Sequence, residues 1–392
     1  MTALRTTLVA ALLLGSCTGA DGPAVIRKIG DPEDRGATVG TWEELPRAAV
    51  GWYRPEGAFW IDGRLVIVAA STIQTWDPQT DAWTTVAGIP QADDCEGCGY
   101  SQTVIWTGRE LLLWGGGLTY LAPDGSEHDG VSVNLSGNVV PLPDAPLRNR
   151  WWHSAVWTGS EMIVFGGGRD SHGRRDGAAF DPSSQTWRHI ARAPVGGYAN
   201  SLIWTGKEMI TWGGIKDSTT GTHGYPTGFI AVGAAYDPAT DEWRMLEESP
   251  LDPRGWHSAV WTGEEMVVWG GVAQPNTTCS DCGYAENAGA YDPTSGHWRR
   301  IDSGPLPGRV EHSAVWTGDR MIIFGGGVPQ GGGGRDDGAV YDPSTDSWEL
   351  LPRPSIEGRE RHAAVWTGEA MIVWGGHDER EFSDGASFSP NR

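Results

Sequence analysis

Four cysteines of the sequence occur in two pairs whose spacing suits metal binding or disulfide formation. They lie in the segments CEGCGY, residues 95–100, and CSDCGY, residues 279–284. A Cys-x-x-Cys-Gly turn aims both sulfurs at one point, so two such turns would supply the four thiolates of a structural zinc site. Alternatively, each pair forms a local disulfide, or the two segments are cross-linked to each other. All three alternatives stay open for Cys95, Cys98, Cys279 and Cys282, and the sequence indicates no other cofactor.

An Arg-x-x-His pair recurs four times along the chain. If these side chains faced a ligand, their cationic groups would suit a carboxylate or a sugar. Groups repeated in every unit are more typical of a scaffold, because catalytic groups must break the symmetry of a repeat. We therefore favour a structural role over a binding role for the four pairs, which are Arg150 with His153, Arg254 with His257, Arg309 with His312, and Arg359 with His362.

Two copies of this pattern differ from the others. Gln102 and Asn200 stand where His is expected, and each follows a Gly-Tyr step that contains Tyr100 or Tyr198. We predict that these residues open a local pocket. Glu56 at the start of the first unit is an acid outside the repeat, where we would look for catalysis. The sequence contains no His-Glu-x-x-His motif, no phosphate-binding loop and no recognisable pair of nucleophile and base.

These residues belong to a unit of about 50 residues that recurs along the chain. Its first signature, as in HSAVWTGSEMIVFGG from His153, repeats with its Trp at 106, 157, 204, 261, 316 and 366. A weaker copy begins at Ala58. The second signature, as in AYDPATDEW from Ala235, is a hairpin, because Asp bonds the backbone ahead of it and Pro presets φ. With a turn at Thr-Gly as well, each unit supplies four strands.

The second strand of each unit is a continuous apolar run, such as MIVF from Met162, so both of its faces should be buried. A four-stranded sheet covered on both faces by copies of itself is a propeller blade. The double Gly that follows lacks Cβ atoms and permits a sharp exit from the strand. The high content of Gly (57), Pro (25) and Trp (22) agrees with many short strands joined by tight turns.

Together these features resemble the kelch repeat, from about residue 42 to residue 388. The resemblance implies an all-β fold, a seven-bladed kelch-type β-propeller with four-stranded antiparallel blades. Two units depart from the pattern. The second has GVSVNLSGNVVPLP in place of the Asp-Pro-Trp element, and the first has Ala69-Ala70 in place of the double Gly.

The seventh unit has only three recognisable strands, the third at GASF from Gly385. The segment TWEELP, residues 41–46, matches the fourth strand of the sixth unit, SWELLP from Ser347. We expect this N-terminal strand to pair into the last blade and close the ring, because pairing hides two free sheet edges.

The connections between second and third strands vary most in length and content. They should share one face with the connections between blades, and both cysteine segments should lie there. Loops on a rigid scaffold carry function, so we predict that this face binds the ligand. The variable connections are residues 168–177, 215–233, 272–288, 327–337 and 377–384.

The N-terminus resembles an export signal. A short apolar run from Leu8 to Leu14 is too short to cross a bilayer. Residues Leu14 to Cys17 resemble a bacterial lipobox, which implies lipidation at Cys17. An ordinary cleaved signal peptide is the alternative. We expect a signal peptide at 1–17, a tether at 18–39 and the propeller at 40–392, anchored by lipid to the cell membrane and facing outside the cytoplasm.

The formal net charge is −21, from 50 acidic and 29 basic residues, which argues against a nucleic-acid partner. We expect a monomeric binding module that presents loops to a protein or a glycan and meets the membrane only through its lipid. The alternative is a propeller enzyme acting on a sugar or sugar acid, of the oxidase or epimerase type found among kelch proteins. A structural spacer in an envelope assembly is a third hypothesis.

Overall fold

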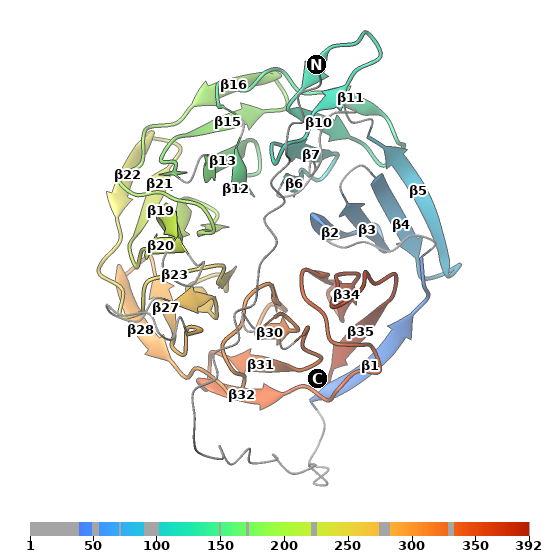
Figure 1. Cartoon of the computed structure of the whole chain (residues 1–392), viewed down its shortest axis with the longest axis vertical. Coiled ribbons are helices and arrows are strands. Elements are labelled where there is room, and N and C mark those ends of the chain that lie inside the picture. The colour runs from blue at the N-terminus through green and yellow to red at the C-terminus, as the bar shows by residue number, and fades with distance from the viewer. Residues whose placement is uncertain are drawn as a thin grey trace, which may run out of the picture. The chain divides into compact units, whose positions relative to one another are not determined.

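The structure is a computed structural model in which the described residues form seven four-stranded antiparallel sheets around a common centre (Figure 1). It describes residues 39–48, 55–69, 72–89, 102–148, 150–169, 172–220, 226–273, 283–327 and 333–391. Within these ranges, no helix is long and apolar enough to cross a membrane. The predicted seven-bladed all-β propeller is confirmed.

Blades 1 to 6 pair their strands in chain order, and the first strand of each blade lies innermost in the ring. Blade 1 contains β2 (Gly57–Ile61), β3 (Arg64–Ala69), β4 (Thr72–Asp77) and β5 (Ala82–Gly88); blade 2 contains β6 (Thr103–Trp106), β7 (Leu111–Trp114), β10 (Gly130–Val133) and β11 (Val139–Pro141); blade 3 contains β12 (Trp151–Trp157), β13 (Met162–Arg169), β15 (Gly177–Asp181) and β16 (Thr186–His189); blade 4 contains β17 (Ser201–Trp204), β18 (Met209–Trp212), β21 (Gly233–Asp237) and β22 (Glu242–Met245).

The remaining three blades repeat this arrangement. Blade 5 contains β24 (Ser258–Trp261), β25 (Met266–Trp269), β27 (Ala288–Asp292) and β28 (His297–Ile301); blade 6 contains β29 (Ser313–Trp316), β30 (Met321–Phe324), β31 (Gly338–Asp342) and β32 (Ser347–Leu350); blade 7 contains β33 (Ala363–Trp366), β34 (Met371–Trp374), β35 (Gly385–Pro390) and β1 (Gly40–Leu45). In blade 2, which lacks the Asp-Pro-Trp element, β10 and β11 nevertheless form the expected third and fourth strands.

The N-terminal strand closes the ring as predicted. β1 pairs antiparallel with β35 along its whole length, with Trp42 opposite Phe388. Trp42 Nε1 donates a hydrogen bond to the carbonyl oxygen of Pro352 in the preceding blade, at 2.7 Å. Tryptophans of other outer strands make the same bond to the preceding blade, as Trp187 does to Pro143 at 2.9 Å and Trp243 to Ala191 at 2.7 Å. The segment TWEELP therefore performs the full role of a fourth strand.

The core lies between blades and is built mainly from their second strands. All four residues of β30, Met321 to Phe324, are fully buried, as the continuous apolar run predicts. Residues of adjacent blades share each main cluster. One such cluster joins Ile322 and Phe324 of blade 6 to Met371 and Val373 of blade 7. Each sheet is thus covered on both faces by its neighbours, which is what defines a propeller.

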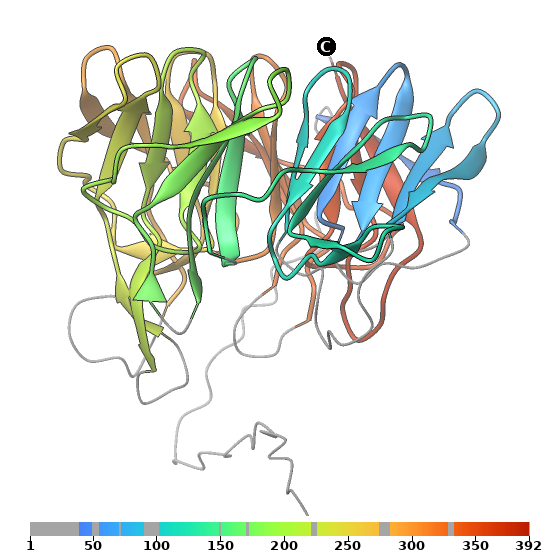
Figure 2. The same ribbon diagram turned by 90° about the horizontal axis from the view of Figure 1, so that it is seen from above.

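The two faces of the ring differ in the length of their connections (Figure 2). The turn face carries the tight turns inside each blade. The loop face carries the connections between second and third strands and those between blades. Short additional strands lie in these connections: β8 (Tyr120–Leu121), β9 (Glu127–His128), β14 (His172–Gly173), β19 (Ile215–Thr220), β20 (Pro226–Phe229), β23 (Arg254–Gly255) and β26 (Val272–Ala273). The β14–β19 pairing joins blades 3 and 4 on the loop face.

Candidate functional site

The four repeated arginines are fully buried beneath the loop face. Arg150 donates to the carbonyl oxygen of Gly166 at 3.0 Å and forms an ion pair with Asp176 at 2.9 Å. Arg309 and Arg359 pair in the same way with Asp337 and Asp384, and Arg254 bonds Asn287. Because protein groups use these guanidinium donors, the geometry supports the structural role that we favoured.

The arginine and its acid do not occur together in every blade. In blade 4 both are absent, because Gly197 occupies the position of the arginine and Val232 that of the acid. Blade 5 keeps its arginine, although Asn287 stands in place of the acid. Burial lowers the pKa of Arg254 to about 10, because its partner Asn287 carries no charge to offset desolvation.

The four repeated histidines fill the contacts between blades. His362 lies against two glycines: a Cβ on Gly325 of blade 6 would lie 2.6 Å from its Cε1, and a Cβ on Gly376 of blade 7 would meet its Cβ at 2.9 Å. The ring also contacts Phe324 edge-on at 5.6 Å, and its Nε2 lies 2.9 Å from Ser313 Oγ. In blades 5 and 6 the double Gly therefore leaves room for a histidine on each side.

These imidazoles are held neutral. Burial, with a smaller effect from the neighbouring arginine, lowers the pKa of each to about 3, for His153, His257, His312 and His362. A neutral imidazole packed between glycines of adjacent blades stabilises the propeller. A ligand role for the histidines stays a prediction, and nothing in their surroundings favours it.

The residues that break the repeat are buried too. Asn200 is 8% exposed and donates to Thr211 Oγ1 at 2.7 Å, so its amide bonds within its own blade. Gln102 is 4% exposed. Tyr198 is 5% exposed, and its ring lies 5.6 Å from that of Trp152. The predicted residues Cys17, Tyr100, Cys95, Cys98, Cys279 and Cys282 lie outside the described residues.

A set of residues with divergent chemistry lies at the start of the innermost strands, where the central channel meets the loop face. Each immediately precedes the repeated His or its Asn substitute. We name this set the mouth ring: Trp152, Ala199, Trp256, Glu311 and Arg361. Glu56 of blade 1 lies one position later, where other blades carry the repeated His. The five residues of blades 3 to 7 share a left-handed φ between +53° and +56°.

Backbone hydrogen bonds join neighbouring members of the mouth ring. The amide of Trp256 donates to the carbonyl oxygen of Ala199, and that of Arg361 donates to the carbonyl oxygen of Glu311, both at 3.1 Å. The left-handed backbone is common to the five copies in blades 3 to 7, so it belongs to the scaffold. The side chain alone differs from blade to blade, and it is displayed on a rigid frame.

One half of the mouth ring is aromatic. Trp151 is 37% exposed and Trp152 is 46% exposed, which is unusual for such large apolar side chains. Trp256 in blade 5 packs against Phe229 of β20 at a ring distance of 6.1 Å. With Tyr198 beneath Trp152, these side chains form an aromatic arc across blades 3 to 5.

The other half is charged. Arg361 Nε donates to Glu311 Oε2 at 2.6 Å across the junction of blades 6 and 7. Glu360 lies beside this pair, and His377 Nε2 is 3.3 Å from Glu360 Oε1. Burial, together with the charge of Glu311, raises the pKa of Glu360 above its usual value. The described residues contain no group of three or more His, Cys, Asp or Glu able to hold a metal ion.

Sequence reasoning named Glu56 and Tyr198 but missed Trp152, Trp256, Glu311 and Arg361. A signal was present, because the position before His varies from Trp to Ala, Glu and Arg, although the His itself and the Arg two residues before this position recur in four blades. A position that varies within a constant frame marks a surface that the scaffold does not specify.

The fold is thus a kelch-type β-propeller whose channel mouth is aromatic on one side and charged on the other. Residues 233–392 match the family model described as the KLHDC2/KLHL20/DRC7 Kelch-repeats domain. Kelch-like protein 23 of Homo sapiens is 25% identical over 257 residues, which are 65% of this chain but only 41% of that protein. Kelch domain-containing protein 3 of Rattus norvegicus is 27% identical over 344 residues, 80% of this chain and 74% of that protein.

Among solved structures, the one titled "Structure of YjhT" is similar in fold. It superposes with a TM-score of 0.55 at 15% sequence identity, covering 77% of this chain and 95% of that one. At this level of identity the likeness concerns the fold alone.

Proposed function

We propose that this protein is an interaction module that binds a partner protein at the mouth ring. The exposed tryptophans 151 and 152 are the observation that carries the proposal. Protein interfaces concentrate their binding energy in a few Trp, Tyr and Arg residues that become buried on association. Trp151, Trp152 and Arg361 supply two of these types on one rim, and a rigid rim binds with little loss of conformational entropy.

Three further observations support binding. The loops around the mouth ring differ in every blade, whereas the turns on the opposite face are nearly constant. The kelch-type scaffold accounts for the repeated Arg and His residues without assigning them chemistry. The curated proteins that this chain resembles are themselves kelch proteins.

We further propose that the module works outside the cytoplasm, tethered through a lipid on Cys17. The support is the apolar run from Leu8 to Leu14 followed by Gly-Ser-Cys. In the native host, wild-type protein is expected in the membrane fraction and Cys17→Ser protein in the soluble fraction. Equal membrane retention of both proteins would refute the anchor.

A second candidate is an enzyme acting on a sugar or a sugar acid. It is favoured by Glu360, whose raised pKa suits a general acid, beside Arg361, which suits a carboxylate. Turnover of sugar acids that is lost in Glu360→Gln would establish this function. A glycan ligand without turnover would instead change the class of partner assigned to the mouth ring.

The binding function is tested by placing a photoreactive amino acid at position 152 and identifying the protein cross-linked in the native envelope. The purified partner is then titrated against wild type and against Trp151→Ala/Trp152→Ala. Loss of a central tryptophan should weaken binding by about 30-fold, since such residues contribute 2 kcal/mol or more.

Leu350→Ala is the matched control. Leu350 is 57% exposed, but it lies on the outer strand β32, away from the mouth ring. Its replacement should leave both affinity and melting temperature unchanged. Equal affinity of the tryptophan variant and wild type would place the interface elsewhere and refute the proposal.

A further inference from the structure

An arginine fills the junction between blades at three successive places near the turn face. Arg188 of blade 3 forms an ion pair with Glu161 of its own blade at 2.6 Å and donates to the hydroxyl of Tyr236 in blade 4 at 3.3 Å. Arg244 and Arg299 repeat this arrangement with the next Glu and the next Tyr. Each arginine lies opposite an alanine of the third strand, in the pairs Ala179–Arg188, Ala235–Arg244 and Ala290–Arg299.

The parts of this junction occur together along the chain. Tyr236, Tyr291 and Tyr341 lie in blades that follow an arginine. Blades 3 and 7 follow no arginine, and they carry Phe180 and Phe388 at the same register. The tyrosine hydroxyl is thus present only at the described junctions where an arginine donates to it. The arginine and the tyrosine together occupy the space between these blades.

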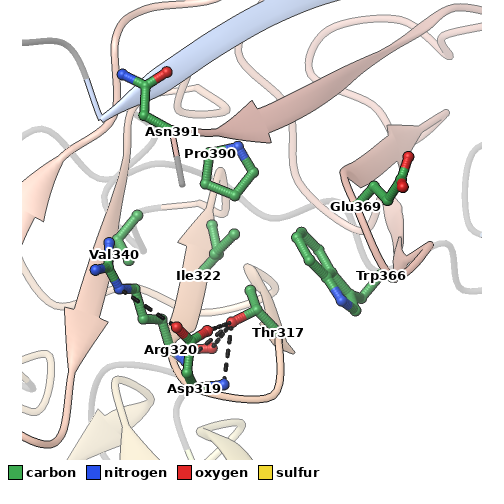
Figure 3. Close-up of a pocket in the computed structure, with 10 residues that line it drawn as sticks. Thr317, Asp319, Arg320, Ile322, Val340, Trp366, Glu369, Pro390 and Asn391 are labelled. Carbon is green, nitrogen blue, oxygen red and sulfur yellow. Dashed lines mark hydrogen bonds and ion pairs between the residues drawn. The ribbon is translucent and has the colours of Figure 1, made fainter.

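The junction of blades 6 and 7 lacks the filler. Glu349 stands in the place of the arginine, Val340 in the place of the alanine, and Arg320 in the place of the glutamate. A groove of about 420 Å³ opens at this junction. Figure 3 shows Arg320 and Trp366 on opposite sides of it, with Ile322 between them.

A second groove supports the link between a missing arginine and an open junction. It lies between blades 1 and 2, with a volume of about 300 Å³, and is lined by Thr75 and Thr84. These threonines form the cross-strand pair at the register of Ala179–Arg188. Both grooves therefore occupy the space that the arginine takes elsewhere.

The groove between blades 6 and 7 is acidic overall. Asp319, Glu349 and Glu369 are exposed around it, and Asp342 lies 3.8 Å from Arg320. The groove and its rim thus carry four carboxylates and one guanidinium. Arg320 already has Asp319 and Asp342 within 4.0 Å, so its positive charge is offset inside the groove. The remaining potential attracts cations.

We propose that this groove binds an arginine side chain of a partner protein, in the space that the chain's own arginine fills at three other junctions. Ile322 and Val340 form the buried apolar base of the groove, and the face of Trp366 would contact the guanidinium, which favours aromatic faces. The site lies on the turn face and is independent of the mouth ring.

The test uses L-argininamide as the probe and the indole N–H resonance of Trp366 as the readout, assigned with Trp366→Phe. Argininamide should shift this resonance in a saturable manner, and the shift should weaken in 1 M salt. Citrullinamide has the same shape without the guanidinium charge and should cause no shift. No response to argininamide, or an equal response to both probes, would overturn the proposal.

Two variants locate the site. Val340→Ala/Glu349→Arg rebuilds the chain's own alanine–arginine pair and should abolish the response of Trp366, while a persistent response would refute the site. Arg320→Gln removes a competing cation and should tighten argininamide binding by about threefold, a typical effect of a surface charge. Unchanged or weaker binding by this variant would show that Arg320 does not compete with the probe and would also refute the proposal.

Discussion

Acidification from pH 7 to pH 5 should destabilise this propeller strongly, because four histidines are held neutral between its blades. Their folded pKa values of about 3 lie below the usual value of 6.5. Between these two values the unfolded chain binds protons that the folded chain excludes. The stability that these residues contribute is therefore fully present above pH 6.5 and is lost as the pH falls.

The magnitude follows from the linkage relation. For one histidine with these two pKa values, the free energy of unfolding falls by about 2 kcal/mol between pH 7 and pH 5. All four histidines act in the same direction, so the total loss exceeds that of a single residue and is large beside the stability of about 5–15 kcal/mol that is typical of a domain. Asp129 and Glu360, whose pKa values are raised by burial, act in the opposite direction.

A single substitution isolates the effect. The chain itself uses Gln at this position in blade 2, so His362→Gln should fold while removing one titrating ring. Chemical unfolding at pH 7 and pH 5, followed by tryptophan fluorescence, gives the free energy of unfolding of each protein. The variant should lose about 2 kcal/mol less than wild type over this range.

His297→Gln is the matched control. His297 is exposed, and its hydrogen bond with Glu247 raises its pKa, so it has the opposite sign. This variant should not reduce the loss of stability in acid. If His362→Gln showed the same pH dependence as wild type, the imidazole would not be excluded from protonation, and the reasoning from burial would be wrong.

Three further predictions concern the scaffold and the cysteines. Gly325→Ala should destabilise the fold by about 3 kcal/mol, since its Cβ would meet His362 at a left-handed φ of +65°; an unchanged melting temperature would contradict the close packing. Deletion of residues 40–48 should lower the melting temperature markedly, and a peptide of the same sequence should restore it; an unchanged melt would refute ring closure by β1. Metal analysis and thiol counting on natively purified protein should give either one zinc with four thiols released on denaturation, or neither, which would indicate disulfides in the segments at 95–98 and 279–282.

The fold was predictable because its information is local and repeated. The Asp-Pro turn, the apolar second strand and the double Gly recur often enough for each copy to support the others. The long-range pairing of β1 with β35 was predictable by counting, since TWEELP matched a strand that blade 7 lacked. The reason for the double Gly was not predictable, because it depends on histidines of two different blades that meet only in the folded ring.

The site was predictable only in part, and for a physical reason. Tyr198 and Asn200 attracted attention because they break a repeat, yet both are buried, since a break in a scaffold position is usually repaired within the scaffold. Trp152 and Arg361 occupy a position at which the repeat has no preferred residue, so neither stands out as an exception. The arginine junctions were likewise hard to predict. An arginine in one blade, such as Arg188, goes with a tyrosine in the next, such as Tyr236, and a single repeat does not contain both partners.

The pairing of β1 with β35 also sets the order of events during folding. Trp42 contacts Pro352 across 310 residues, so this contact requires the closure of a loop of nearly the entire chain. Each earlier blade can form from about 50 consecutive residues, but blade 7 must recruit a strand that precedes all the other blades in the sequence. Closure should therefore be the last and slowest step, because distant pairings have a large entropic cost. Until then β35 presents an unpaired edge, and the nascent chain is most open to misassembly with a neighbouring molecule at this point.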